Sequence, residues 1–154
     1  MSAEARIKEL NLEFPSAPRS LGVYKFVHVV DGLAYVSGHG PLKPDGTSVC
    51  GRLGENLQKE QGYEAAKLTA INVIRSLREH FGSLDKVRRL VKTTGFVNST
   101  PDFKDHPIVI NGFSELMREV FGPEDGLGAR SAMGVAALPG GWAVEVEAVF
   151  QVAE

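Results

Sequence analysis

Arg130 is the residue of this chain whose type and surroundings most clearly suggest chemistry. It stands between a stretch with two glycines, residues 126–128, and an apolar stretch that begins at Ser131. A loop that leads into a strand can direct a side chain toward a ligand, and a guanidinium binds a carboxylate through two parallel hydrogen bonds. The alternative is that Arg130 only forms an ion pair with Glu145 or Glu147.

The familiar catalytic and cofactor-binding motifs are absent from the sequence. The four histidines show no spacing typical of metal ligands, and there is no P-loop, dinucleotide-binding glycine motif or nucleophile elbow. The single cysteine, Cys50, excludes an internal disulfide and fits a reducing cytoplasm. We therefore expect an activity without metal or cofactor, carried by arginine, carboxylates, hydroxyls and backbone amides.

Length and charge narrow the class of protein. A chain of 154 residues suits one domain, 1–154, in which residues 1–20 form an N-terminal helical extension and a connector. The formal net charge of −2 disfavours nucleic acid as a partner. No apolar run reaches the length of a membrane span, and no signal-peptide pattern is present, so we expect a cytoplasmic protein.

Hydrophobic periodicity predicts the elements that must position Arg130. Alternation predicts strands over residues 22–30 and 33–37, and Asp31-Gly32 predicts the turn of a hairpin between them. Helical spacing predicts helices over residues 62–81 and from about residue 106 to 121, with a strand over 87–97 between them. Residues 126–152 are expected to form a second hairpin, with its turn at 139–141.

The resulting order, β-β-α-β-α-β-β after a short helix, indicates a two-layer α+β fold. Two helices can cover only one face of a five-stranded sheet. Candidates for the other face are apolar or small, namely Thr94, Phe96, Val135 and Ala137. This predicts an oligomer in which the sheets face one another.

Five sequence segments, in this order and spacing, resemble the Rid (YjgF-like) family, also called the endoribonuclease L-PSP family. They are LGVY at 21–24, VSGHGP at 36–41, VKTTGFV at 91–97, VING at 109–112 and ARSAMGVAALPGGWAVEVEAVF at 129–150. The resemblance implies a chorismate-mutase-like fold and a homotrimer with ligand clefts between subunits. It also implies cofactor-free hydrolysis of reactive 2-imino and enamine acids to 2-keto acids and ammonia.

The same resemblance implies roles for particular residues. Arg130 matches the ligand-binding arginine of the family, Tyr24 its cleft tyrosine, and Glu145 the strand glutamate associated with the attacking water. Further substrate contacts are expected from Ser37, Gly38, Asn111 and Ser131. Two positions depart from the family pattern and alter the cleft wall. Ala132 stands where many deaminating members have Cys or Thr, and Gly134 where the founding type has Glu.

The expected mechanism follows from these assignments. Arg130 would hold the substrate carboxylate, and Glu145 would orient or deprotonate a water. Tyr24 of a neighbouring subunit would hydrogen-bond the imine nitrogen or shape the pocket. The residues leave three alternatives open: Tyr24 as a packing residue, a non-catalytic trimer that senses a small carboxylate, and an endoribonuclease. The acidic composition and the lack of a histidine pair make the ribonuclease the weakest of the functions.

Overall fold

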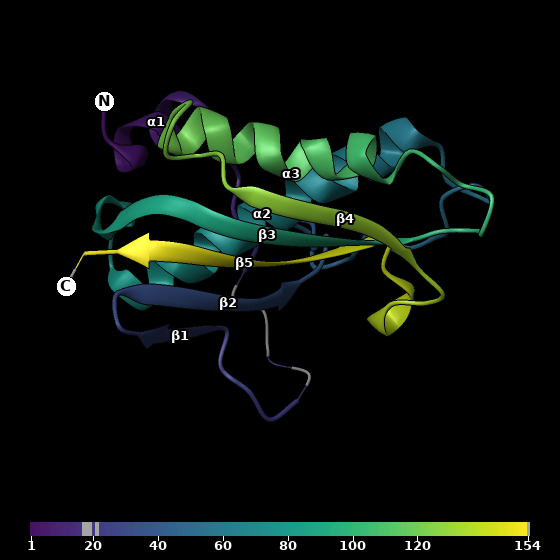
Figure 1. The fold of residues 1–154 in the computed structure, drawn as a ribbon, viewed down its shortest axis with the longest axis horizontal. Helices are drawn as coiled ribbons and strands as arrows, with labels where there is room; N and C mark the ends of the chain where they lie inside the picture. Colours follow the sequence, from purple (N-terminus) through teal and green to yellow (C-terminus); the bar gives the residue numbers. More distant parts are fainter. Residues whose placement is uncertain (17–19, 21, 154) are drawn as a thin grey trace.

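The computed structural model describes residues 1–16, 20 and 22–153, and its centre is a five-stranded sheet (Figure 1). The strand order is β1-β2-β5-β3-β4. The strands are β1 Val27–Val30, β2 Leu33–His39, β3 Val87–Asn98, β4 Ala129–Val135 and β5 Val144–Val152. The helices are α1 Ala3–Glu9, α2 Lys59–Phe81 and α3 His106–Phe121, with single 3₁₀ turns at η1 Leu84–Lys86 and η2 Pro139–Gly141. The predicted α+β fold is confirmed.

The predicted second hairpin is wrong, because β4 and β5 are not neighbours. The long strand β3 lies between them, pairing parallel with β4 and antiparallel with β5. The glycines of the 139–141 turn do adopt positive φ angles, but the chain there crosses the end of β3 before it enters β5. A turn signal between two apolar runs identifies a reversal of the chain, whereas the partner of each strand is decided by contacts distant in sequence.

The strand-helix-strand order occurs twice in the chain, and the two occurrences differ in how their strands pair. The unit β3-α3-β4 ends in a directly paired parallel strand. Strands β2 and β3, which flank α2, are both antiparallel to β5 and therefore parallel to each other, but β5 separates them. The insertion of the last strand between two earlier ones could not be predicted from the order of elements alone.

The helices α2 and α3 pack against each other and cover one side of the sheet, as predicted (Figure 1). Helix α3 lies along β4, and α2 lies behind β5 and β2. Their apolar faces meet inward-pointing strand residues in a core whose largest fully buried side chains include Phe113, Phe150, Leu53, Ile74 and Leu77. The N-terminal helix α1 joins the ends of the two long helices, because Glu4 pairs with Arg78 of α2 and Arg6 donates to the carbonyl of Val120 in α3.

The first hairpin has the predicted turn but a shorter first strand. Asp31 and Gly32 have φ angles of 49° and 74°, the left-handed pair that a two-residue hairpin turn requires. Strand β1 begins at Val27 rather than at residue 22, so Tyr24 lies before the strand. The predicted connector over residues 14–20 lies partly outside the described residues. Residue 21, the first of the 21–24 motif, also lies outside them.

Residues 41–58 contain no helix, but isolated β-bridges tie this loop to the domain. Leu53 pairs with Ser99 beyond the end of β3, and Cys50 pairs with Trp142 before β5. Leu53 is fully buried in the core. The loop is therefore part of the packed structure, and it brings Arg52 to the end of β3, where Nη2 donates to the carbonyl of Ser99.

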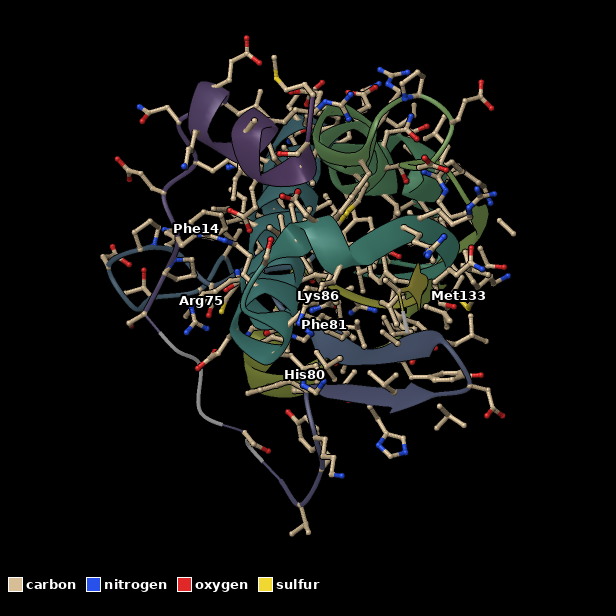
Figure 2. All side chains as sticks on the ribbon, turned by 90° about the vertical axis from the view of Figure 1, so that its left-hand side faces the viewer. Phe14, Arg75, His80, Phe81, Lys86 and Met133 are labelled. Carbon is tan, nitrogen blue, oxygen red and sulfur yellow. The ribbon has the colours of Figure 1, made fainter. Side chains whose placement is uncertain are left out.

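The side of the sheet away from α2 is uncovered within one chain, and we call it the open face. Neighbouring strands place Glu145 beside Phe96, and Phe96 beside Met133, on this face. Figure 2 shows Met133 on the opposite side of the sheet from α2. Thr94 also lies on the open face, as predicted, and Val135 ends β4, but Ala137 lies beyond the strand and is not part of the sheet.

Candidate functional site

Arg130 lies between the edge strand β4 and helix α3. Its guanidinium donates from Nη1 to Asn111 Oδ1 at 2.8 Å and to Ser114 Oγ at 3.1 Å. Nη2 donates to the carbonyl oxygen of Pro107 at 3.3 Å. All three acceptors belong to α3, so the helix holds the guanidinium in place against the strand.

Two of the five N–H groups of Arg130 remain for a ligand. The three bonds to α3 use both hydrogens of Nη1 and one of Nη2, which leaves Nε–H and the second hydrogen of Nη2. Among the described residues, no acceptor bonds to either group. Both remaining groups are charged donors that can bind the oxygens of a carboxylate.

The charge of Arg130 has no carboxylate within 4.0 Å in the described part of the chain, so the predicted alternative of an ion pair with Glu145 or Glu147 is wrong within one subunit. Partial burial lowers the pKa of Arg130 from its usual value, because desolvation disfavours the charged form. A partly desolvated cation without a counter-ion favours an anionic ligand.

The helix residues that hold Arg130 were only partly predicted. Asn111 was expected near the ligand, and the structure places it on the guanidinium. Ser114 was missed, although a polar residue three positions after Asn111 lies on the same side of a helix. Pro107 was also missed, because it contributes a backbone carbonyl that no sequence pattern marks.

Glu145 lies on the open face, opposite Arg130. Its neighbours in β5, Val144 and Val146, are fully buried in the core, so the side chain between them points the other way. Burial, and then the nearby charge of Glu147, raise the pKa of Glu145 above its usual value. A carboxylate with a raised pKa is a stronger base at neutral pH.

Ser37 and Gly38 lie on the same face of the sheet as Glu145, not beside Arg130. A Cβ atom at Gly38 would collide with the carboxyl group of Glu145, so the absence of a side chain there gives the carboxylate its place. Ser37 donates from Oγ to the carbonyl of Lys25 at 2.6 Å, which ties β2 to the segment before β1. Ser37 and Glu147 also line an open cavity of about 380 Å³ on this face of the sheet.

Tyr24 and Ser131, the remaining predicted site residues, lie near opposite edges of the sheet. Tyr24 is half-exposed and packs edge-on against Phe26, with ring centroids 5.8 Å apart. It precedes β1, at the opposite edge of the sheet from β4. Ser131 follows Arg130 in β4 and pairs with Thr94, so its side chain lies on the open face.

The predicted site residues therefore form separate groups within one chain. Arg130 and Asn111 meet on the helix side at the β4 edge, whereas Glu145 and Gly38 meet on the open face, where Ser37 lines a cavity together with Glu147. Ser131 lies on the open face at β4, and Tyr24 lies at the β1 edge.

The two departures from the family pattern, Ala132 and Gly134, follow Arg130 along the same side of β4. A Cβ atom at Gly134 would lie 2.6 Å from Nε2 of His106 and 2.6 Å from Oγ of Ser99. These two side chains also contact each other, with Nε2 and Oγ 3.1 Å apart. Sequence reasoning missed His106 and Ser99, because a histidine and a serine seven residues apart follow no recognised motif.

Neither a membrane-spanning nor a metal-binding element is found in the part of the chain that the structure describes. None of its helices is long and apolar enough to cross a bilayer. Within residues 1–16, 20 and 22–153, no three His, Cys, Asp or Glu side chains gather in a way that could hold a metal ion.

Two named relatives align with almost the whole chain. Protein TCP17 of Trypanosoma cruzi is 39% identical over 148 residues, which cover 96% of this chain and 92% of that protein. A Lactococcus lactis protein named "Putative regulator AldR" is 30% identical over 136 residues, which cover 88% of this chain and 92% of that protein.

A solved structure and a family model agree with these alignments. The crystal structure of protein Atu1372 of Agrobacterium tumefaciens, whose function is described as unknown, is 35% identical with a TM-score of 0.86. The match covers 97% of this chain and 91% of that one. The model of a family described as "YjgF/chorismate_mutase-like, putative endoribonuclease" matches residues 4–140. This chain therefore belongs to the YjgF/chorismate-mutase-like family, which includes the Rid proteins.

Proposed function

We propose that this protein is a homotrimeric hydrolase that converts reactive 2-imino and enamine acids to 2-keto acids and ammonia without a cofactor. One observation carries the proposal: the Arg130 guanidinium is held by three acceptors of α3, keeps two N–H groups without a described acceptor and has no described carboxylate partner. Membership of the family supports a role with a small molecule. The single domain over residues 1–154 and the cytoplasmic location are parts of the same proposal.

The positions of Arg130 and Glu145 require more than one copy of the chain for this reaction. Within a subunit the two side chains lie on opposite sides of the sheet, so they cannot both contact one small substrate. A neighbouring copy that packs against the open face can bring its own β4 edge to Glu145. The half-exposed Tyr24 lies outside the sheet, where it too can reach a neighbour.

The apolar side chains of the open face support such an assembly. Tyr35 and Met133 are 47% and 40% exposed, and Phe96 and Val149 lie between them in the sheet. Exposed apolar side chains on a sheet that no helix covers are typical of a surface buried by a partner. We propose that three copies bury this surface and form the sites between them.

The reaction at such a site needs only the substrate, water and proton transfers. Arg130 holds the carboxylate and thereby fixes the neighbouring carbon of the C=N bond. A water oxygen bonds to that carbon while Glu145 accepts a water proton and the nitrogen gains a proton. Glu145 then gives its proton to the nitrogen of the resulting carbinolamine, and the carbon–nitrogen bond breaks. Ammonia leaves, the C=O bond of the 2-keto acid forms as the hydroxyl loses its proton to solvent, and Glu145 is again ionised.

Two variants separate binding from catalysis. An amino-acid oxidase generates the imine, and a trapping reagent measures how fast it disappears. We expect Arg130→Lys to lose binding and turnover, because lysine lacks the planar pair of donors. We expect Glu145→Gln to bind the carboxylate but hydrolyse the imine roughly a hundredfold more slowly. Full turnover by Arg130→Lys would contradict the proposed role of the guanidinium.

Mixed trimers test whether the site is shared between copies. Arg130→Lys and Glu145→Gln chains, unfolded together and refolded, form interfaces at which one chain supplies an intact arginine and the other an intact glutamate. We expect such mixtures to recover part of the activity that each variant lacks alone. Each variant refolded alone is the control. Absence of recovery, with mixed trimers demonstrated by mass spectrometry, would show that the two residues do not act across an interface.

A second candidate is a regulatory trimer that binds a carboxylate without turnover. The alignment with a protein named as a regulator favours this reading. It requires Arg130 but not Glu145, so tight carboxylate binding with no turnover in the unmodified protein would favour it. RNA cleavage by a nuclease-free preparation, abolished by Arg130→Ala, would instead support the ribonuclease that the family description names.

A further inference from the structure

We propose that His106 is the second recognition residue of the Arg130 site, and that the preferred ligand is a carboxylic acid with a second carboxylate at its far end. This inference rests on the proposed function in one respect, which is that Arg130 holds the first carboxylate.

His106 and Arg130 lie along the same side of β4. Arg130, Ala132 and Gly134 alternate with residues of the open face, so all three positions face α3. Helix α3 contacts Arg130 through Asn111 and reaches Gly134 with its first residue, His106. Helix and strand therefore run in opposite directions, with the guanidinium and the imidazole at successive places between them.

Small residues separate the two groups. Ala132 has only a methyl group, and Gly134 has no side chain because the imidazole occupies that space. The guanidinium also contacts the carbonyl of Pro107, the residue next to His106. A ligand held by Arg130 can thus extend past Ala132 to the imidazole, and no other β4 side chain stands in its way.

His106 has one nitrogen fixed and one nitrogen free. Nε2 lies 3.1 Å from Oγ of Ser99, which is buried, and Phe103 packs edge-on against the ring at 5.3 Å between centroids. Nδ1 has no hydrogen-bond partner among the described residues. The ring is therefore held in one orientation, and in the tautomer in which Ser99 Oγ donates to Nε2, Nδ1 carries the proton that can bind a ligand oxygen.

The charge around His106 favours an anion over a neutral group. Arg52 donates from Nη2 to the carbonyl of Ser99, and its Nε is buried without a partner in the described part of the chain. No described carboxylate lies within 4.0 Å of the Arg52 guanidinium. The nearest acid in sequence to His106, Asp105, has Lys59 at 4.0 Å. This end of the site therefore combines a guanidinium that has no described carboxylate partner with the free imidazole nitrogen of His106.

Two pairs of unreactive 2-hydroxy acids test the second carboxylate. (S)-Malate and (S)-2-hydroxybutanoate have four carbons and differ only in a terminal carboxylate or methyl. (S)-2-Hydroxyglutarate and (S)-2-hydroxypentanoate repeat the comparison with five carbons, so ligand length does not decide the result. Calorimetric titration of the unmodified protein is expected to show at least one diacid binding roughly tenfold or more tightly than its matched monoacid, the effect of one hydrogen bond to a charged group.

Variants assign the preference to His106. We expect His106→Leu to bind the diacid no more tightly than the monoacid. His80→Leu is the matched control, because His80 lies at the other edge of the sheet, beside β1, and should keep the preference (Figure 2). If His106→Leu does not fold, as judged by circular dichroism, His106→Gln and Ser99→Ala take its place. Each should reduce the preference, since His106→Gln removes the imidazole and Ser99→Ala removes the contact that fixes its orientation.

The outcomes distinguish this inference from the proposed function. Monoacid binding that Arg130→Lys abolishes, with no preference for either diacid, overturns the second carboxylate and leaves the Arg130 site intact. A diacid preference that survives both His106 variants overturns the role of His106. If no acid binds the unmodified protein, the carboxylate site fails and this inference fails with it.

Discussion

Arg130 and Glu145 lie on opposite sides of the same sheet, although the two residues are expected to act on one substrate. Arg130 pairs in register with Thr93, which is buried beneath the helices, whereas Glu145 pairs with Phe96 on the open face. Strand alternation makes this separation rigid, because a one-residue shift would expose the buried face of β5. The predictions below test what each side contributes.

Asn111→Ala should weaken binding of a small carboxylate roughly tenfold, because Nη1 of Arg130 loses its 2.8 Å acceptor and the guanidinium loses its orientation. Titration of 2-hydroxybutanoate measures the change. Ser114→Ala removes the longer bond, at 3.1 Å, and should have the smaller effect. Equal affinity of Asn111→Ala and the unmodified protein would show that α3 does not orient the guanidinium.

Gly38→Ala should lose imine hydrolysis while keeping the fold, because the new Cβ atom would displace the carboxyl group of Glu145. The imine-trapping assay and circular dichroism measure the two properties. Gly22→Ala is the control, since a Cβ there meets only Tyr24 at 3.5 Å, an ordinary contact. Unchanged turnover in Gly38→Ala would remove Glu145 from the proposed mechanism.

Phe96→Lys should prevent assembly, because it places a charge in the middle of the open face. Light scattering should give three times the 16.6 kDa chain mass for the unmodified protein and a smaller mass for the variant. Arg89→Lys, at an exposed position of the same strand, should remain trimeric. A stable monomer of the unmodified protein at micromolar concentration would contradict the trimer.

Ser76→Ala should reduce the free energy of unfolding by about 1–3 kcal/mol, because it leaves a buried nitrogen unpaired. The carbonyl of Ser37 can only accept, so Nδ1 of His39 carries the proton and donates to it at 2.6 Å. In the neutral ring, Nε2 then accepts from Ser76 Oγ at 2.7 Å. Urea unfolding at pH 8 measures the loss. No loss would show that this buried bond contributes nothing to stability.

The same histidine should make stability depend on pH. Burial lowers the pKa of His39 below its ordinary 6.5, so the unfolded chain takes up a proton more readily than the folded one. The contribution of His39 is present above pH 6.5 and is lost as the pH falls below that value. His39→Gln should show a smaller loss of stability between pH 7 and pH 5 than the unmodified protein. Equal slopes would indicate that other groups cause the pH dependence.

Glu145 should affect the pH dependence of stability in the opposite direction to His39, and Glu145→Gln tests this. Because the pKa of Glu145 is raised from 4.5 in the folded protein, its contribution to stability is full below pH 4.5 and is lost as the pH rises through the folded value. Above that pH the folded protein bears the free-energy cost of ionising a partly buried carboxyl group. Glutamine does not ionise, so the variant should gain thermal stability over the unmodified protein at pH 7 but not at pH 4. A matched gain at both values would rule out relief from ionisation as its cause.

The sequence by itself determined the local elements and the family, and it made Arg130 the candidate for the site. Local signals were sufficient where the deciding contacts are close in the chain. Asp31-Gly32 specifies a hairpin turn, Pro107 and Gly122 bound α3, and the alternation of residues 144–152 specifies a strand with one buried side. Each depends on backbone geometry or side-chain period within a few residues.

Only the tertiary structure decided which residues meet. The pairing of β3 with both β4 and β5 separates Arg130 from Glu145, and that choice rests on contacts between strands far apart in sequence. The place of His106 against Gly134 depends in the same way on the antiparallel course of α3 along β4. Strands and helices pair through buried area and register, which no local pattern encodes, and those pairings put Arg130, Ala132 and His106 along one side of an edge strand.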